Sequence, residues 1–204
     1  MTANLGPVGL LAQRGPLDWR RLVDWLCADA VITSEEAQRI TARCAQAESR
    51  QHPLVRLSSV AVRRASDGRP LDIEALTQWL AQRAGLDYLR IDPLKVDVAK
   101  VADAMSAAYA ERHHILPIQV TAAEVVVATA EPYVSDWVAE VERQMRRPVR
   151  RVLASPLEIQ RYVAEFFALA KSVRTGQKAG SPSRWMPTTS APATSTWSRG
   201  ASRA

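Results

Sequence analysis

Two β-rich runs near the middle of the chain constrain its fold most strongly. Ile115–Thr121 and Val125–Thr129 are separated by a short polar break, and two such runs a few residues apart predict a β-hairpin. The second run is apolar on both faces, so we expect its strand to be covered on both sides. Helical patterns precede and follow the hairpin at Val96–Arg112 and Val134–Arg146. The hairpin is therefore expected to form the core of a small α/β unit.

Further elements are predicted on both sides of this core. Tyr88–Ile91 and Val149–Leu153 read as strands, which gives a mixed sheet of about three to four strands. Asp72 is placed to cap a helix that runs to Arg83, and Gly85 is placed to end it. Ser155-Pro156-Leu157-Glu158 has the pattern of a capping box. It predicts a last helix that runs to about Lys171.

The N-terminal part is predicted to be a pair of helices. The first fits Leu17–Asp29, and the second follows Thr33-Ser34-Glu35-Glu36, a capping box in which Glu36 reaches back to the start of the helix. The second helix is expected to continue through Glu48. Because the joint is short, the two helices should be neighbours. Leu54–Val62 is expected to be irregular, since prolines and a glycine flank it.

These patterns predict an α/β (α+β) chain with four parts. They are a flexible N-terminus at 1–16, a helical pair with an irregular connector at 17–70, a small α/β docking domain at 71–174, and a disordered basic tail at 175–204. The tail is expected to be disordered because its Ser, Thr, Pro, Ala and Gly residues show no apolar periodicity.

The net charge of +6 is unevenly distributed and argues against nucleic-acid binding. Residues 176–204 carry four basic residues and no acid, so the rest of the chain is close to neutral. The arginine cluster at 146–151 follows a predicted helix end, where the helix dipole attracts cations. A DNA or RNA groove needs a continuous basic surface. A nucleic-acid reader is therefore the least favoured reading.

The chain shows no motif of an enzyme, a metal site or a membrane span. No Gly-rich phosphate loop and no nucleophile elbow is found. Cys27 and Cys44 lack the spacing of metal ligands and are expected to be buried small hydrophobes. No apolar run approaches the roughly 20 residues that cross a bilayer. We therefore predict a cytoplasmic binding module without a cofactor, which does not insert into a membrane.

An ordered set of segments resembles the N-terminal domain of the type II secretion and type IV pilus assembly ATPases. The segments are Gly85–Asp92, Tyr109–Pro117, Val125–Pro132 and Ala154–Ile159. Each segment is short, but they occur in one consistent order, and the resemblance extends over roughly residues 17–175. It implies a small α/β domain preceded by a helical pair.

The resemblance also implies a function. In this family the domain docks the motor onto the cytoplasmic part of an inner-membrane platform protein, which places it at the inner membrane through a partner. Full-length relatives continue into an ATPase motor with Walker motifs, and often a zinc site, that this sequence lacks. ATP is therefore expected only through a motor domain absent from this chain. The sequence suggests a truncation, or a frame shift that produces the tail. Support of an ATPase subunit in trans is a further alternative.

Some members of this family bind cyclic di-GMP through two copies of R-L-G-x-x-L-x-x-x-G-x-I-x-x-x-x-L. By resemblance the first copy gives four candidate ligand-binding residues: Arg21, Leu22, Leu26 and Ile32. Val23 and Ala30 replace the two glycines and Ala37 the last leucine. Arg56-Leu57 could start a second copy, but only with four extra residues. Cyclic di-GMP binding and a helix pair without a ligand both remain open.

Overall fold

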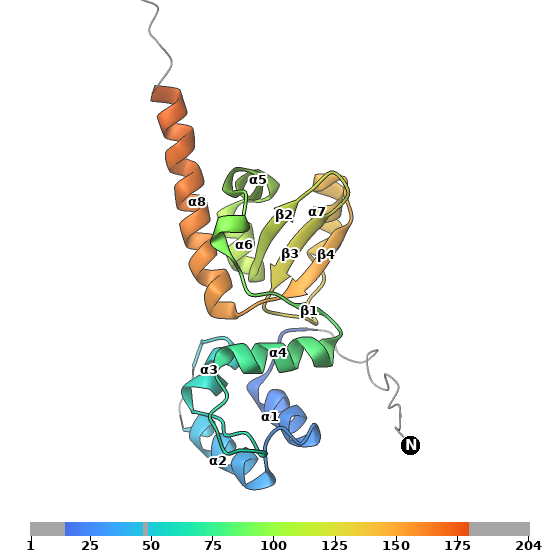
Figure 1. Ribbon diagram of the computed structural model, residues 1–204, viewed down its shortest axis with the longest axis vertical. Coiled ribbons are helices and arrows are strands. Elements are labelled where there is room, and N and C mark those ends of the chain that lie inside the picture. The colour runs from blue at the N-terminus through green and yellow to red at the C-terminus, as the bar shows by residue number, and fades with distance from the viewer. Residues whose placement is uncertain (1–14, 47–48, 180–204) are drawn as a thin grey trace, which may run out of the picture.

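The computed structural model describes residues 15–46 and 49–179. A group of helices, α1 to α4, lies at one end of the molecule, and a four-stranded sheet with its own helices lies at the other (Figure 1). The expected α/β fold class is confirmed. The last helix continues to Ala179, five residues into the segment predicted as a tail at 175–204. Residues 180–204, and 1–14 of the predicted flexible N-terminus, lie outside the described residues.

Capping side chains set the starts of α1 (Trp19–Ala28) and α2 (Ser34–Ala45). The Thr33 hydroxyl accepts the Glu36 N–H at 3.2 Å, as its half of the capping box predicts. The reciprocal half is wrong. The Glu36 carboxylate accepts instead from Arg39 Nε at 2.6 Å and from the Arg63 N–H at 2.7 Å. The Arg39 guanidinium, one turn away, and the Arg63 N–H are stronger partners for the Glu36 carboxylate than the backbone N–H at the start of the helix.

The segment predicted as irregular contains a helix, α3 (Pro53–Ser59). Pro53 stands in its first turn, and His52 caps it by accepting the Leu54 N–H on Nδ1 at 3.2 Å. Proline suits this position because its missing N–H is not needed there. The prediction was wrong because histidine is not among the usual capping residues. For α4 (Ile73–Ala84), the expected Asp72 cap and the left-handed Gly85 are both confirmed.

The sheet has the strand order β1-β4-β3-β2. Its strands are β1 (Asp87–Tyr88), β2 (Ile115–Val120), β3 (Val125–Thr129) and β4 (Val149–Leu153). The predicted hairpin is confirmed, because β2 and β3 pair antiparallel, with a register shift between Pro117 and Gln119. β4 pairs parallel with both β3 and β1, which makes the sheet mixed. All five residues of β3 are buried, as its apolar run predicts.

The helix expected over Val96–Arg112 is two helices, α5 (Val98–Ala104) and α6 (Ala107–His113). Met105 between them is extended, with φ −159° and ψ 166°. The Ser106 hydroxyl then accepts the Tyr109 N–H at 3.2 Å and starts α6. Apolar periodicity continues across this break, so the pattern alone did not reveal it. A serine inside a helical pattern is the available signal, because serine favours caps over helix interiors.

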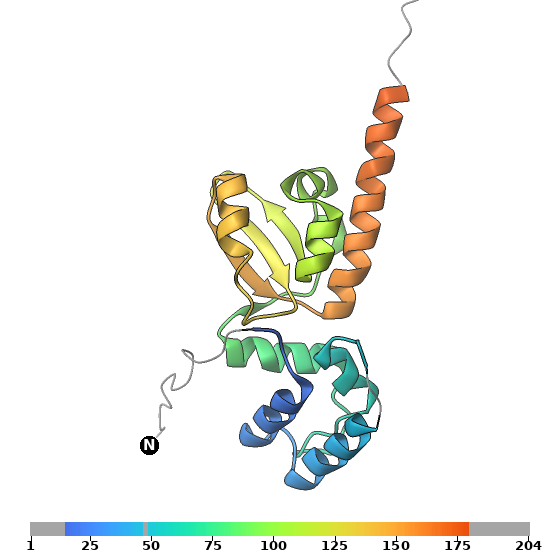
Figure 2. The same ribbon diagram turned by 180° about the vertical axis from the view of Figure 1, so that it is seen from behind.

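Two helices follow the hairpin, α7 (Val138–Met145) and α8 (Pro156–Ala179). Figure 2 shows α7 lying across the sheet, while α5 and α6 lie between the sheet and α8. The capping box expected at α8 does not form as predicted. Ser155 Oγ is buried without a hydrogen-bond partner. Glu158 instead accepts the Ile91 N–H at 3.1 Å, which ties the start of α8 to the segment after β1.

Two hydrophobic clusters fill the two ends of the molecule. One contains the buried faces of α1 to α4, including Leu22, Leu57 and Leu80. The other lies among β2, β3, β4 and the helices around them. Leu153, the last residue of β4, is fully buried and belongs to the helical cluster. The sheet thus contributes directly to the core of the helical part, and the two parts share a packed junction.

Candidate functional site

The structure places the four residues proposed from the family motif in two different environments, the hydrophobic core and the surface. Leu22 and Leu26 are fully buried and Ile32 is 2% exposed, all within the helical cluster. Arg21 is exposed on α1. The three apolar residues therefore hold the helices together, and Arg21 is the only one of the four whose side chain faces solvent. The structure brings the apolar three together as core.

One replaced glycine of the motif falls where the backbone is left-handed. Ala30 has φ 55°, in the tight turn after α1. Glycine is favoured at such a position because a Cβ costs roughly 1–2 kcal/mol there. The turn alone therefore accounts for glycine at this motif position, without contact to a ligand. Val23, at the other replaced glycine, is 2% exposed and packs inside α1's buried face.

The turn after α3, the first helix of the pair α3–α4, resembles the turn after α1 in the pair α1–α2. Ala61 has φ 51°, close to that of Ala30, and each alanine comes four residues after a fully buried leucine, Leu57 and Leu26. Leu57 therefore occupies the place that Leu26 has in the first pair. The sequence reading had instead placed Arg56-Leu57 at the start of the second copy. The positive φ at Ala30 and Ala61, which the sequence could not reveal, shows which residues of the two turns correspond.

Arginine side chains gather around Trp19 at the start of α1. The guanidinium carbons of Arg20 and Arg56 lie 4.6 Å and 4.9 Å from the Trp19 ring centre, within the range of cation–π contact. Arg56 also donates to the Cys44 carbonyl. Together with Arg50 they line an open hollow of about 560 Å³. Clustered guanidinium groups of this kind suit a phosphate-bearing ligand.

A buried carboxylate joins the helical part to the sheet part. Glu131, which follows β3, is 7% exposed. Its Oε2 accepts the Leu17 N–H at 2.8 Å, and its Oε1 lies 3.2 Å from His52 Nε2. The ring N–H of His52 points off the line of a straight hydrogen bond, so His52 Nε2 has no hydrogen-bond partner by geometry. No local pattern could predict this contact, because Leu17, His52 and Glu131 are far apart along the chain.

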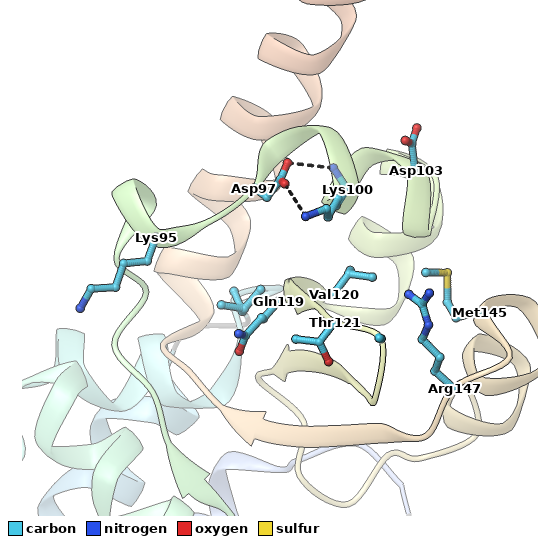
Figure 3. A pocket seen from close by; sticks show the side chains of 11 residues that line it. Lys95, Asp97, Lys100, Asp103, Gln119, Val120, Thr121, Met145 and Arg147 are labelled. Atoms are coloured by element: carbon cyan, nitrogen blue, oxygen red, sulfur yellow. Dashed lines mark hydrogen bonds and ion pairs between the residues drawn. The ribbon is translucent and has the colours of Figure 1, made fainter.

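A second open cleft, of about 720 Å³, lies at the end of β2 (Figure 3). The 3-10 turn at Pro93–Lys95, the first turn of α5 and the end of α7 surround it. Lys95, Lys100 and Arg147 extend around the end of the strand (Figure 3). Ile118 and Val120 supply apolar surface to the lining. The cleft combines apolar side chains with three cations.

Neither hollow has the geometry of an enzyme active site. Within the described ranges, no three His, Cys, Asp or Glu residues are grouped so as to hold a metal ion. Burial raises the pKa of the Glu74 carboxyl, and the nearby Glu158 adds to the effect. The Tyr88 hydroxyl donates to Glu74, however, so this carboxyl serves the joint between α4 and β1. No described helix is long and apolar enough to span a membrane.

A domain family matches the sheet part of this chain. Residues 84–173 match the MshEN domain. This range begins at the end of α4 and includes the whole sheet and most of α8. This part of the chain is therefore similar to the MshEN domain, and the resemblance to the N-terminal domain of the secretion and pilus assembly ATPases is confirmed.

Individual proteins are also similar to this chain. The chain is 35% identical over 130 residues to the type IV pilus assembly ATPase TfpB of Acinetobacter baylyi. The match covers 63% of this chain but 22% of TfpB, so the chain spans about a fifth of that relative. A structure of MshE with cdg has a TM-score of 0.51 at 17% identity, over 72% of this chain and 98% of that one. The N-terminal domain of XpsE gives 0.46 at 17% identity, over 71% and 92%.

Proposed function

We propose that this chain is a non-catalytic docking and regulatory domain of a type II secretion or type IV pilus assembly machine. In this role it binds the cytoplasmic part of an inner-membrane platform protein and lies at the membrane through that partner. The MshEN match over residues 84–173 carries the proposal. The described residues add support, because neither hollow assembles a nucleophile, a base and an oxyanion-binding group.

A binding measurement tests the docking role. The full chain is immobilised, and the purified cytoplasmic domain of the platform protein from the same machine is titrated over it by biolayer interferometry. We expect saturable binding in the micromolar range, typical of a transient interface. Absence of binding at 100-fold higher concentration refutes the role. A phosphate-release assay on the same sample is expected to show no ATP hydrolysis, and hydrolysis above the buffer rate contradicts the non-catalytic assignment.

A second candidate function is binding of cyclic di-GMP. The arginine cluster around Trp19 favours it, because a cyclic dinucleotide presents phosphates for guanidinium groups and flat bases for stacking. The hollow beside this cluster is lined by Arg20, Arg50 and Arg56. The MshE structure, described as containing cdg, shares the fold. The ligand would then lie against α1 and α3, the first helices of the pairs α1–α2 and α3–α4.

Titration calorimetry with cyclic di-GMP tests this second function. Two arginine variants test whether the ligand contacts the arginine cluster or Arg21, the residue that the family motif indicates. Arg20→Ala is expected to weaken binding about tenfold by removing a charged partner, whereas Arg21→Ala, a neighbour outside the hollow, is expected to change it less than twofold. The reverse order moves the site to Arg21. No heat at submillimolar ligand excludes cyclic di-GMP as a ligand.

A further inference from the structure

The outer edge of β2 is buried at the start of the strand and exposed at its end. β2 is the last strand of the sheet, so no other described strand pairs with its outer side. Its first three residues are buried, and α5, α6 and α8 pack against the strand. Beyond Pro117 the burial stops: Gln119 is exposed, and Ile118 and Val120 are half-buried. The strand therefore ends as an uncovered edge that opens into the cleft of Figure 3.

The backbone of Val120 faces outward at this edge. The Thr121 N–H donates to the Glu124 carbonyl at 3.0 Å, which makes these two a hydrogen-bonded pair of the hairpin. The next pair, Val120 with Val125, must then be a non-hydrogen-bonded pair. Val125 agrees, because its N–H donates away from β2, to the Pro148 carbonyl at 2.9 Å. The Val120 N–H and C=O thus point to the outer side, where an incoming strand would find a donor and an acceptor.

Three cations and two carboxylates line the cleft at this edge. Lys95, Lys100 and Arg147 line the cleft. Asp97 is occupied, because it caps α5 through the Lys100 N–H at 3.2 Å and pairs with Lys100 Nζ at 3.0 Å. Asp103 points away from the strand (Figure 3). Among the described residues, none of the ion pairs includes Arg147. Lys95 Nζ lies 3.4 Å from Asp92 Oδ2 in an exposed pair, which contributes little stability and can be exchanged for a partner's carboxylate. A partner that enters here would therefore meet Arg147 and Lys95.

An exposed leucine adds apolar surface beside these cations. Leu94, at the tip of the 3-10 turn next to Lys95, is 95% exposed, the most exposed large apolar side chain among the described residues. Half-buried Ile118 and Val120 and the side chain of Met145 continue the apolar surface into the cleft. An extended segment laid along β2 would place alternate side chains against this surface and the others toward the cations.

We propose that the end of β2 is a docking edge for an extended acidic segment of a partner protein. The segment adds as a short strand through the Val120 N–H and C=O, while its carboxylates pair with Lys95 and Arg147. This inference names the surface and the chemistry of what binds, and it rests on the docking role proposed above. The side-chain pairs supply specificity and the strand pairing supplies orientation.

A synthetic peptide tests the edge by itself. The probe is a fluorescein-labelled decapeptide of alternating Thr and Glu, and its counterpart with Lys in place of Glu is the charge control. Fluorescence anisotropy with the full chain at low salt is expected to show tighter binding of the acidic peptide by at least tenfold, and weakening as salt is raised. Hydrogen exchange is expected to show slower exchange at Val120 with the acidic peptide. Equal binding of the two peptides, or none at millimolar concentration, overturns the proposal.

Variants connect the edge to the platform partner. Lys95→Glu with Arg147→Glu reverses two charges of the cleft, and Arg143→Glu on the exposed side of α7 is the matched charge control. Val120→Pro removes the outward N–H without a ladder hydrogen bond, and Val120→Ala retains it. Circular dichroism verifies that each variant is folded. The double reversal and the proline are each expected to weaken platform binding about tenfold or more, and the two controls less than twofold.

The outcomes separate this inference from the docking role. Wild-type binding to the platform domain with unchanged binding by the double reversal and by Val120→Pro refutes the β2 edge and leaves the docking role standing. Absence of wild-type binding refutes the docking role instead. The peptide measurement then decides the edge independently, because it needs no platform protein.

Discussion

The carboxylate of Glu131 offers a direct measurement of how firmly the helical part is held to the sheet. It is 7% exposed, accepts the Leu17 N–H at 2.8 Å and lies 3.2 Å from His52 Nε2. Both partners belong to the helical part, whereas Glu131 follows β3. In Glu131→Ala the Leu17 N–H loses its acceptor, which costs about 1–3 kcal/mol for a buried amide. His52 Nε2 makes no hydrogen bond to the carboxylate by geometry, so its lost contact adds only about 1 kcal/mol, and we expect a total of about 2–4 kcal/mol.

This change is large compared with the 5–15 kcal/mol by which single domains are usually stable. The free energy of unfolding is measured by urea titration, with circular dichroism and tryptophan fluorescence followed together. Trp25, which packs edge-on against Tyr133 just after Glu131, reports on the junction. Glu131→Gln preserves an acceptor for the Leu17 N–H, so its cost should be about 1–2 kcal/mol.

Glu165→Ala is the matched control. Glu165 forms a solvent-exposed i,i+4 pair with Arg161 on α8, so its loss is expected to cost less than about 1 kcal/mol. If Glu131→Ala costs no more than this control, Glu131 does not hold the two parts together. A fluorescence transition that separates from the circular dichroism transition only in Glu131→Ala would show that the helical part unfolds first when the contact is lost.

Three further predictions follow from the backbone and the charged groups. Ala30→Gly and Ala61→Gly should each raise the free energy of unfolding by about 1 kcal/mol, because both alanines have positive φ, and thermal melts measure the gain. The hydrogen bond from the Arg39 side chain is the main cause that lowers the pKa of Glu36 below 4.5. The ionised Glu36 carboxylate therefore stabilises the folded state above pH 4.5, and this stabilisation is lost as the pH falls further. Glu36→Gln should accordingly flatten the acid limb of a curve of unfolding free energy against pH. Burial raises the pKa of Tyr109 from 10.0 to about 12; stability should therefore fall between those pH values, and Tyr109→Phe should remove part of that fall in alkaline urea titrations.

Local chemistry predicted the sheet well but missed contacts between distant residues. The apolar run Val125–Thr129 could only be a strand buried on both faces, and it is. Asp72 and Gly85 marked the ends of α4 correctly because each uses neighbouring backbone groups alone. Glu36 and Glu158 were expected to complete capping boxes, but the Arg63 and Ile91 amides brought by the fold compete for them. A box motif cannot show such competition.

The candidate ligand site was harder to predict than the fold. The family motif indicated Leu22, Leu26 and Ile32, which the structure places in the hydrophobic core. A motif shows which residue types recur but does not separate residues that pack from residues that bind. The arginine cluster depends on Arg56 reaching Trp19, from a helix that the sequence did not predict. Without α3, the two arginines over the same ring could not be foreseen.

The length of α8 makes its far end sensitive to small movements of the sheet against which its first half packs. The helix has 24 residues, and its first half packs beside the sheet while its second half extends past the body (Figure 1). Leu169 and Val173, on that second half, are about half exposed. The extending half has 12 of the 24 residues and is roughly 18 Å long at 1.5 Å per residue, so a tilt of about 10° at its base shifts its tip by about 3 Å. A rigid lever of this kind would convert a small rotation of the sheet into a displacement as large as an atom's diameter.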